Sequence, residues 1–298
     1  MIRSKRELRK AVLIVSPSIL LVGVFVYGFI LWSLRTSVSA WEGIRPDYTF
    51  IGLQNYINLF QSTRFQIDLW NTAYFTLFFI VLCIVLGFVL AFLINRDIRG
   101  EGVFRTIYLF PMALSFIVTG VVWRWILNPT FGVNILLANL GLPSDWGWYT
   151  DPTRIAGFHV ALTSLILAAS WQFAGYTMAI YLAGLRGIPY DVIESARMDG
   201  ATEVMIIRKV ILPMLRPITL SAVIVLGHIS LKIFDLVMAM TGRGPRFATD
   251  FPGVFMFETT FTGNRYGEGA AISIVMLLMV ALVIVPYLVH TFRQEAHE

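Results

Sequence analysis

The chain has 298 residues, of which 57% are hydrophobic and only 14% are charged, and its mean hydropathy is +0.73. A soluble domain carries about 25% charged residues, so this composition excludes an ordinary soluble protein and favours a helical membrane protein. The net charge of +5 does not indicate nucleic-acid binding, because the basic residues lack the interleaved aromatics typical of such surfaces. The single cysteine, Cys83, excludes an intramolecular disulfide and a cysteine-based metal site. We therefore expect no metal and no cofactor in this chain.

Six apolar segments are each long enough to cross a hydrocarbon core of roughly 30 Å as a helix. They span about 11–33, 72–94, 106–127, 156–183, 217–240 and 269–292. Since backbone polar groups must be paired within lipid, helices are expected throughout. The sequence thus predicts an all-α polytopic protein, with residues 1–298 forming a single transmembrane domain. Pro111 and Pro286 fall inside the third and sixth segments, where each permits a kink.

The basic residues indicate how the chain is oriented. With the N-terminus inside, the cytoplasmic segments hold 14 of the 23 basic residues and the outer loops hold seven. This bias predicts that both termini and residues 184–216 lie in the cytoplasm. The basic N-terminus followed by an apolar run also resembles a signal peptide, but the run exceeds the roughly 7–15 residues of a signal core.

The loop between the fourth and fifth segments carries the strongest local pattern. Pro189 suits a first helical turn, Gly200 suits a helix-ending position with positive φ, and Thr202 can cap a second short helix. Val204, Ile207, Val210 and Ile211 would form one apolar face of that helix, which Pro213 would end. Periodicity alone leaves open whether this helix pair contacts lipid or another protein.

This loop resembles the "EAA" loop of binding-protein-dependent ABC importer permeases, in which Glu-Ala-Ala is followed at fixed spacing by Gly and by Ile-x-Leu-Pro. The matching positions are Glu194-Ser195-Ala196, Gly200 and Val210-Ile211-Leu212-Pro213, with Ser195 and Val210 as the two departures. In that family the loop couples the permease to its ATPase. The resemblance therefore implies an ATPase-coupling role for Glu194, Ser195, Ala196, Asp199, Gly200, Ala201, Leu212 and Pro213.

Further motifs are similar to those of maltose-type sugar permeases, and specifically to the first subunit of such pairs. They are Ile51-Gly52-Leu53-Gln54-Asn55-Tyr56, Leu182-Ala183-Gly184-Leu185 before Ile188-Pro189, and Phe234-Asp235 with Met240-Thr241-Gly242-Arg243-Gly244-Pro245 and Thr249. Arg243 replaces a glycine of the last motif. The phrase from Thr249 to Phe257 is similar to permeases for glucose and α-glucosides, which favours maltose- or trehalose-like substrates.

The resemblance implies a type I importer permease fold in a prokaryotic cytoplasmic membrane. It also implies a second homologous permease subunit, a dimer of cytoplasmic ATPases that binds ATP and Mg²⁺, and an external sugar-binding protein. The chain itself has no G-x-x-x-x-G-K-[ST] phosphate loop, so we do not expect it to be the ATPase or an enzyme.

Polar residues inside the predicted spans are candidates for substrate contact, because they are costly in lipid. They are Trp171, Gln172 and Tyr176 in the fourth segment and Lys232 and Asp235 in the fifth. Lys232 and Asp235 are three residues apart, so they can also face each other as an ion pair on one helical turn. In many importers of this kind one permease alone contacts the sugar, so this chain can lack a sugar site.

Two other classes remain as alternatives. A six-helix secondary transporter or channel would need coupling acids in the membrane, and Asp235 is the one clear example. An intramembrane hydrolase would need a serine motif, and the sequence has no Gly-x-Ser-Gly element.

Overall fold

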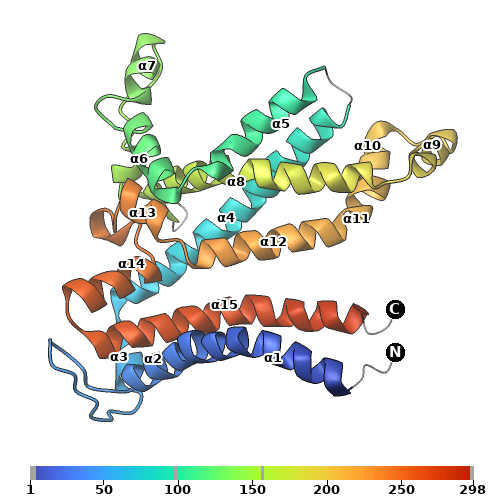
Figure 1. Ribbon diagram of the computed structural model, residues 1–298. Coiled ribbons are helices and arrows are strands. Elements are labelled where there is room, and N and C mark those ends of the chain that lie inside the picture. Colours follow the sequence, from blue (N-terminus) through green and yellow to red (C-terminus); the bar gives the residue numbers. More distant parts are fainter. Residues whose placement is uncertain (1–4, 97–98, 156–157, 296–298) are drawn as a thin grey trace. The chain divides into compact units, whose positions relative to one another are not determined.

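The computed structural model describes residues 5–96, 99–155 and 158–295 (Figure 1). The chain divides into two compact units, one made of residues 1–63 and 255–278 and the other of residues 64–254 and 279–298. The predicted single domain over residues 1–298 stays a prediction, and the two units are described in turn.

The first unit begins with a long apolar helix. It comprises α1 (Lys5–Val22), a π-helical turn (Gly23–Gly28) and α2 (Phe29–Ser37). The apolar span runs over Val12–Ser37, with none of its most apolar window buried inside the protein. This helix covers nearly all of the first predicted segment and extends about one turn beyond it. The unit also holds α3 (Gln54–Gln61), the second half of α14 (Pro252–Phe257), a π-helical turn (Glu258–Thr262) and the beginning of α15 (Tyr266–Glu295).

The residues that matched the Gly-Leu-x-Asn-Tyr motif fix a loop against the end of α2. Gly52 has φ +62°, which glycine adopts without strain. The Asn55 amide then donates to the carbonyls of Ser37 and Ser39, both at 2.9 Å. The Tyr56 hydroxyl lies 2.6 Å from the Ser37 hydroxyl. The motif therefore anchors this loop to the end of the first span, since its polar side chains form hydrogen bonds with backbone groups there.

The second unit contains the remaining helices and one small sheet. In chain order they are α4 (Thr63–Ile94), α5 (Glu101–Leu109), a 3₁₀ turn (Phe110–Ala113), α6 (Phe116–Ile126), α7 (Val133–Asn139), a 3₁₀ turn (Trp148–Thr150), β1 (Arg154–Ile155), β2 (Phe158–His159), α8 (Ala161–Arg186), α9 (Tyr190–Met198), α10 (Glu203–Ile206), a π-helical turn (Ile207–Ile211), α11 (Leu212–Met214), α12 (Arg216–Leu231), α13 (Asp235–Met240) and a 3₁₀ turn (Pro245–Phe247). Strands β1 and β2 pair antiparallel, a small exception to the predicted all-α class.

Within the described residues, four helices are long and apolar enough to cross a membrane, and the total is six if two bent pairs each count as one span. The straight ones are Val12–Ser37, Thr63–Ile94, Ala161–Arg186 and Tyr266–Pro286. The fourth predicted segment, 156–183, was placed too early. Residues 156–157 lie outside the described part, and the strand β2 follows them.

The third predicted segment, 106–127, is broken rather than kinked. The halves Glu101–Ala113 and Phe116–Ile126 meet at an angle of 101°. Pro111 is the second residue of a 3₁₀ turn, and Leu114 after it is extended with ψ 146°. Ser115 caps the next helix, because its hydroxyl accepts from the Val118 N–H at 3.2 Å. The kink permitted at Pro111 is thus a sharp break at Leu114, and no single straight helix spans 106–127.

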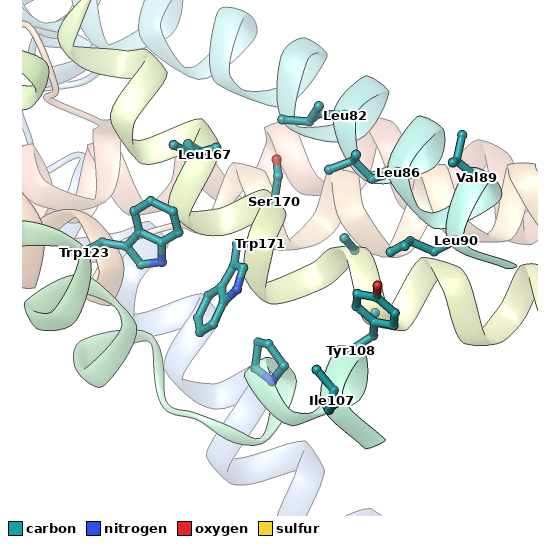
Figure 2. A pocket seen from close by; sticks show the side chains of 13 residues that line it. Leu82, Leu86, Val89, Leu90, Ile107, Tyr108, Trp123, Leu167, Ser170 and Trp171 are labelled. Carbon is teal, nitrogen blue, oxygen red and sulfur yellow. The ribbon is translucent and has the colours of Figure 1, made fainter. Parts of the chain in front are cut away.

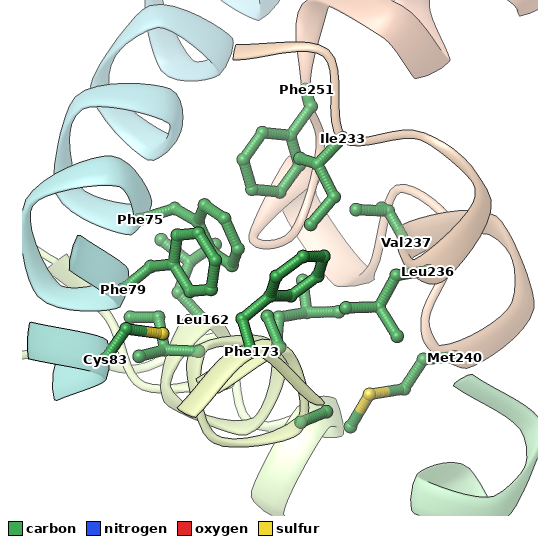
Figure 3. Close-up of a cluster of buried hydrophobic side chains, with 14 of the residues drawn as sticks. Phe75, Phe79, Cys83, Leu162, Phe173, Ile233, Leu236, Val237, Met240 and Phe251 are labelled. Carbon is green, nitrogen blue, oxygen red and sulfur yellow. The ribbon is translucent and has the colours of Figure 1, made fainter. Parts of the chain in front are cut away.

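Aromatic side chains from four parts of the second unit form its main core (Figure 3). Phe79 of α4 meets Phe173 of α8 edge to face, with ring centroids 5.9 Å apart, and Phe75 meets Phe251 at 5.5 Å. Leu236 and Val237 of α13 complete the cluster and are fully buried. Helices in lipid gain little from the hydrophobic effect, so this close packing is what holds α4, α8 and α13 together.

Two glycines of the second unit permit close contact between helices. A side chain at Gly87 of α4 would collide with Thr177 of α8, and one at Gly175 of α8 would collide with the Tyr108 carbonyl of α5. Small residues at such crossings are typical of membrane helix packing.

Candidate functional site

The loop after α8 folds into the predicted helix pair, which lies at the end of α8 in Figure 1. Pro189, with ψ 133°, sits one residue before the first helical residue of α9 rather than inside the first turn. At the other end, Gly200 has φ +80°. The Gly200 N–H donates to the Arg197 carbonyl and the Ala201 N–H to the Ala196 carbonyl, each at 3.0 Å. These two bonds make a Schellman cap, so the predicted helix-ending role of Gly200 is confirmed.

The second half of the loop also begins as expected. The Thr202 hydroxyl accepts from the Met205 N–H at 3.4 Å and caps α10. Ile206 and Ile211 are buried, and Ile207 and Val210 pack partly against the same cluster as Tyr181 of α8. The inclusion of Val204 in this apolar face was wrong, because its side chain is 60% exposed.

The proline that was expected to end this helix does not do so. Pro213 lies within α11, which continues to Met214, and the chain then bends by 64° into α12. Because α10, the π-helical turn and α11 run on as one helix from Glu203 to Met214, Pro213 removes one hydrogen bond near the end of that helix, just before the bend. Pro217 is the second residue of α12, where an N–H is not needed.

The coupling residues predicted from the motif divide into an outer and an inner set. Glu194, Ser195, Asp199, Gly200 and Leu212 are exposed, whereas Ala196, Ala201 and Pro213 are partly buried. Large apolar side chains flank the outer set, with Tyr190 65% and Met198 85% exposed. Ala196 and Ala201 thus pack the helix pair onto α8. The Glu194 carboxylate faces outward, with the apolar side chains of Tyr190 and Met198 beside it.

Trp171 lines an apolar cavity of about 380 Å³ among α4, α5, α6 and α8 (Figure 2). Its indole meets that of Trp123 edge to face, with ring centroids 5.9 Å apart. Ser170 and Tyr108 bring hydroxyl groups to the lining, which is otherwise mostly leucine, valine and isoleucine. Trp171 therefore faces the second and third predicted segments rather than the fifth.

Gln172 and Tyr176 do not line this cavity. Gln172 is 2% exposed, and its amide donates to the Leu114 carbonyl at 2.8 Å. Leu114 is the extended residue in the broken third span, so Gln172 satisfies a backbone acceptor that the break leaves unpaired. Tyr176 packs against the aromatic core of the second unit.

Lys232 and Asp235 do not share a helical turn, which corrects the predicted arrangement. Lys232 ends α12, Phe234 is non-helical with φ −138° and ψ −59°, and Asp235 begins α13. Among the ion pairs of the described residues, none joins these two exposed side chains. Asp235 stands in the first turn of α13, where a carboxylate is favoured by the helix dipole. The structure thus does not gather the five candidate substrate residues in one cavity.

A buried ion pair beside the loop after α13 was missed by the sequence reasoning. Arg64 Nε lies 2.6 Å from Asp250 Oδ2, and the Asp250 side chain is fully buried. The Asn71 amide donates to the carbonyls of Phe247 and Asp250, both at 3.0 Å. The partners are 176 to 186 positions apart in the sequence, so no local pattern could have revealed them.

The same loop explains the Thr-Gly-x-Gly-Pro motif. The Thr249 hydroxyl donates to the Gly242 carbonyl at 3.2 Å, and a side chain at Gly244 would collide with Thr249. Gly242 and Gly244 have positive φ, but Arg243 does not. A glycine is therefore not required at position 243, which accounts for the arginine there.

The residues that the structure describes contain no group of three or more His, Cys, Asp or Glu side chains that could hold a metal ion. The described residues form several apolar spans, of which two are broken, and a capped helix pair that follows α8. This is the architecture of a polytopic helical permease. A family model for the "binding-protein-dependent transport system inner membrane component" matches residues 83–295. The chain belongs to this family, which confirms the resemblance seen in its motifs.

Relatives match the chain over nearly its whole length. A probable ABC transporter permease of Pyrococcus horikoshii is 39% identical, covering 98% of this chain and 99% of the relative. A xylose/arabinose import permease of Haloferax volcanii is 36% identical over 92% of this chain and 85% of its own length. A trehalose/maltose transport system permease of Thermococcus litoralis is 30% identical over 97% and 96%.

A solved structure shows the same fold. A chain of a bacterial ABC transporter that imports the acidic polysaccharide alginate superposes with a TM-score of 0.77, covering 97% of this chain and 96% of that one, at 22% identity. The fold of this chain is therefore that of an ABC importer permease.

Proposed function

We propose that this chain is a permease subunit of an ATP-driven sugar importer in a prokaryotic cytoplasmic membrane. The observation that carries the proposal is the 36% identity, over 92% of this chain, to a permease named for xylose and arabinose import. In this assembly the chain forms half of the translocation pathway beside a second, homologous permease. An external binding protein delivers the sugar, and a pair of cytoplasmic ATPases binds ATP and Mg²⁺.

The helix pair α9–α10 is the element that we propose as the contact with the ATPase. Its inner side packs on α8 through Ile206, so a force on α9 reaches a membrane helix through close-packed side chains. Its outer side presents Glu194 between the exposed side chains of Tyr190 and Met198. Apolar anchors around one charged group are typical of protein interfaces. This assignment places residues 184–216 and both termini in the cytoplasm.

For the substrate we propose a neutral sugar, with glucose or an α-glucoside such as a maltose- or trehalose-like disaccharide as the first candidates. The support is the phrase from Thr249 to Phe257 and the 30% identity to a trehalose/maltose permease. Trp171 is 38% exposed and can present an aromatic face to a sugar ring. Lys232 and Asp235 lie exposed on either side of the break after α12, where their charges can bind hydroxyl groups.

The test is reconstitution of the complete importer in liposomes with internal ATP and external binding protein. We expect uptake of labelled glucose, maltose or trehalose, together with ATP hydrolysis that rises when the sugar-loaded binding protein is added. Uptake that persists without ATP, and follows an ion gradient instead, would contradict the proposal and favour a secondary transporter.

A further inference from the structure

A groove crosses the bend between α11 and α12 in the second unit. It has a volume of about 490 Å³. Its lining consists of Arg208, Leu212, Pro213, Arg216, Thr219, Leu220 and Val223. Leu212 and Pro213 belong to the matched motif, but neither the ATPase contact nor the sugar accounts for a ligand in this groove.

The sequence spacing explains why these residues share one surface. Arg208, Leu212, Arg216 and Leu220 follow one another at intervals of four, which places successive members on the same side of a helix. The chain passes through a π-helical turn and then the 64° bend along this stretch. The stripe continues from the loop helices onto α12, so charged and apolar side chains occupy one continuous surface.

The charges of the groove have one sign. Both arginine side chains are exposed, and no carboxylate is among the lining residues. Neither arginine takes part in the ion pairs found in the described part of the chain. Two guanidinium groups on one groove repel each other until an anion lies between them, and guanidinium binds phosphate through paired hydrogen bonds.

Apart from Thr219 the rest of the lining is apolar, and its last three residues, Thr219, Leu220 and Val223, belong to the membrane helix α12. Leu212 and Leu220 are 42% and 44% exposed, and Val223 is partly buried one turn further along α12. A free phosphate or a nucleotide would leave these apolar groups in contact with water. A ligand that fits the whole groove therefore has an anionic head and an apolar tail.

We propose that this groove binds an anionic phospholipid, with its phosphate held by Arg208 and Arg216 on either side of Leu212 and an acyl chain lying along Leu220 and Val223 of α12. Basic pockets at the end of a membrane helix are a recognised setting for such headgroups. The site adjoins the bend through which the loop helices join α12, so a bound lipid would brace that joint.

The test uses the purified full-length chain and native mass spectrometry. Phosphatidylglycerol and phosphatidylcholine with the same acyl chains are titrated separately. We expect tight retention of one phosphatidylglycerol by the wild type and a loss of about tenfold or more in the double variant Arg208→Gln/Arg216→Gln. The matched control is Lys209→Gln, because Lys209 is an exposed neighbour that does not line the groove. It should retain the lipid as the wild type does.

Three results would overturn the proposal. The first is equal retention by the double variant and the wild type, and the second is an equal loss in Lys209→Gln, which would mean diffuse attraction to a basic surface. Inorganic phosphate at millimolar concentration is added as a competitor, and displacement of the lipid by phosphate alone would show that the acyl chain contributes nothing. Because lipid retention is measured without transport, the outcome is independent of the substrate and of the ATPase contact.

Discussion

Arg64 Nε and Asp250 Oδ2 lie 2.6 Å apart, although 186 residues separate them in the chain. This ion pair fastens the loop after α13 to the beginning of α4. The loop holds Arg246 and Phe247 at φ +52° and +60°, a backbone region that non-glycine residues rarely adopt. The ion pair between Arg64 and Asp250 holds this strained loop backbone in place.

We therefore predict that Asp250→Asn strongly destabilises the protein. Removing one partner of a buried ion pair costs about 3–5 kcal/mol, because the other charge stays in a poorly solvated place. Thermal unfolding of the purified chain in detergent would measure this loss. Asp145→Asn is the control, since Asp145 is exposed, and it should leave the transition unchanged. Equal transitions in both variants would mean that the pair contributes no stability.

A second prediction concerns the ATPase contact. Glu194→Ala and Gly200→Val should reduce sugar uptake by at least about tenfold while insertion stays normal. The first removes the exposed carboxylate from the proposed interface, where loss of one charged partner costs on the order of 2–5 kcal/mol. The second forces a β-branched residue to adopt φ +80° and distorts the cap. Uptake and ATP hydrolysis are measured in the reconstituted importer, with Glu42→Ala, in an exposed loop outside the motif, as the control. Normal uptake in both loop variants would remove α9–α10 as the coupling element.

The third prediction separates Trp171 from its neighbour Gln172. Trp171→Ala should lower uptake and the sugar-stimulated part of ATP hydrolysis, and it should also lower thermal stability, because the indole, which is only 38% exposed, loses its contact with Trp123. Gln172→Leu should lower stability by about 1–3 kcal/mol, since it leaves the Leu114 carbonyl unpaired. Uptake assays and thermal unfolding are run on both variants. If Trp171→Ala transports as the wild type does, the sugar contacts lie elsewhere, most simply in the partner permease.

The fourth prediction concerns sidedness. In a Cys83→Ala background, Glu203→Cys should react with a membrane-impermeant maleimide only after cells are opened, because the loop is assigned to the cytoplasm. The Glu203 side chain is 61% exposed, so the rest of the chain does not shield a cysteine at this position from the maleimide. Glu42→Cys, on the opposite side, should react in intact cells. Labelling of the position 203 cysteine in intact cells would reverse the topology.

The fifth prediction concerns the hairpin of β1 and β2. Arg154 Nε donates to His159 Nε2 at 3.0 Å, so Nε2 is unprotonated and Nδ1 carries the proton toward the Pro152 carbonyl at 3.1 Å. Burial lowers the pKa of His159 below its ordinary value near 6.5, and the charge of Arg154 lowers it further. At pH values above the ordinary histidine pKa, the neutral His159 ring thus stabilises the hairpin. This stability is lost as the pH falls through the lowered pKa of His159. The protection factors of the amides in residues 158–160, which are corrected for the intrinsic base-catalysed exchange rate, should fall between pH 7.5 and 5, and this fall should vanish in His159→Gln.

The spans and the loop caps could be predicted from sequence because their signals are local. Gly200 and Thr202 act on backbone groups within a few positions, and apolar runs reveal candidate spans directly. Pro111 indicated a kink in the third span, but a sharp break at Leu114 could not be predicted, since the other flanking residues are as apolar as those of a straight helix. Its stabilising partner, Gln172, lies 58 positions away and looked like a substrate ligand. Likewise, neither of the two residues between Lys232 and Asp235 is a proline or a glycine, so the sequence gives no sign of the break there.

The break in the third span also bears on how the chain is made. Its halves, Glu101–Ala113 and Phe116–Ile126, are about 20 and 16 Å long, so neither alone crosses the roughly 30 Å core. The insertion machinery encounters this stretch before the ribosome has synthesised Gln172, which later pairs with the Leu114 carbonyl. We therefore expect the stretch to enter the bilayer as one straight apolar helix and to bend when α8 arrives. A variant without the glutamine amide would then fail late in biogenesis, with normal insertion but a span trapped in its straight form.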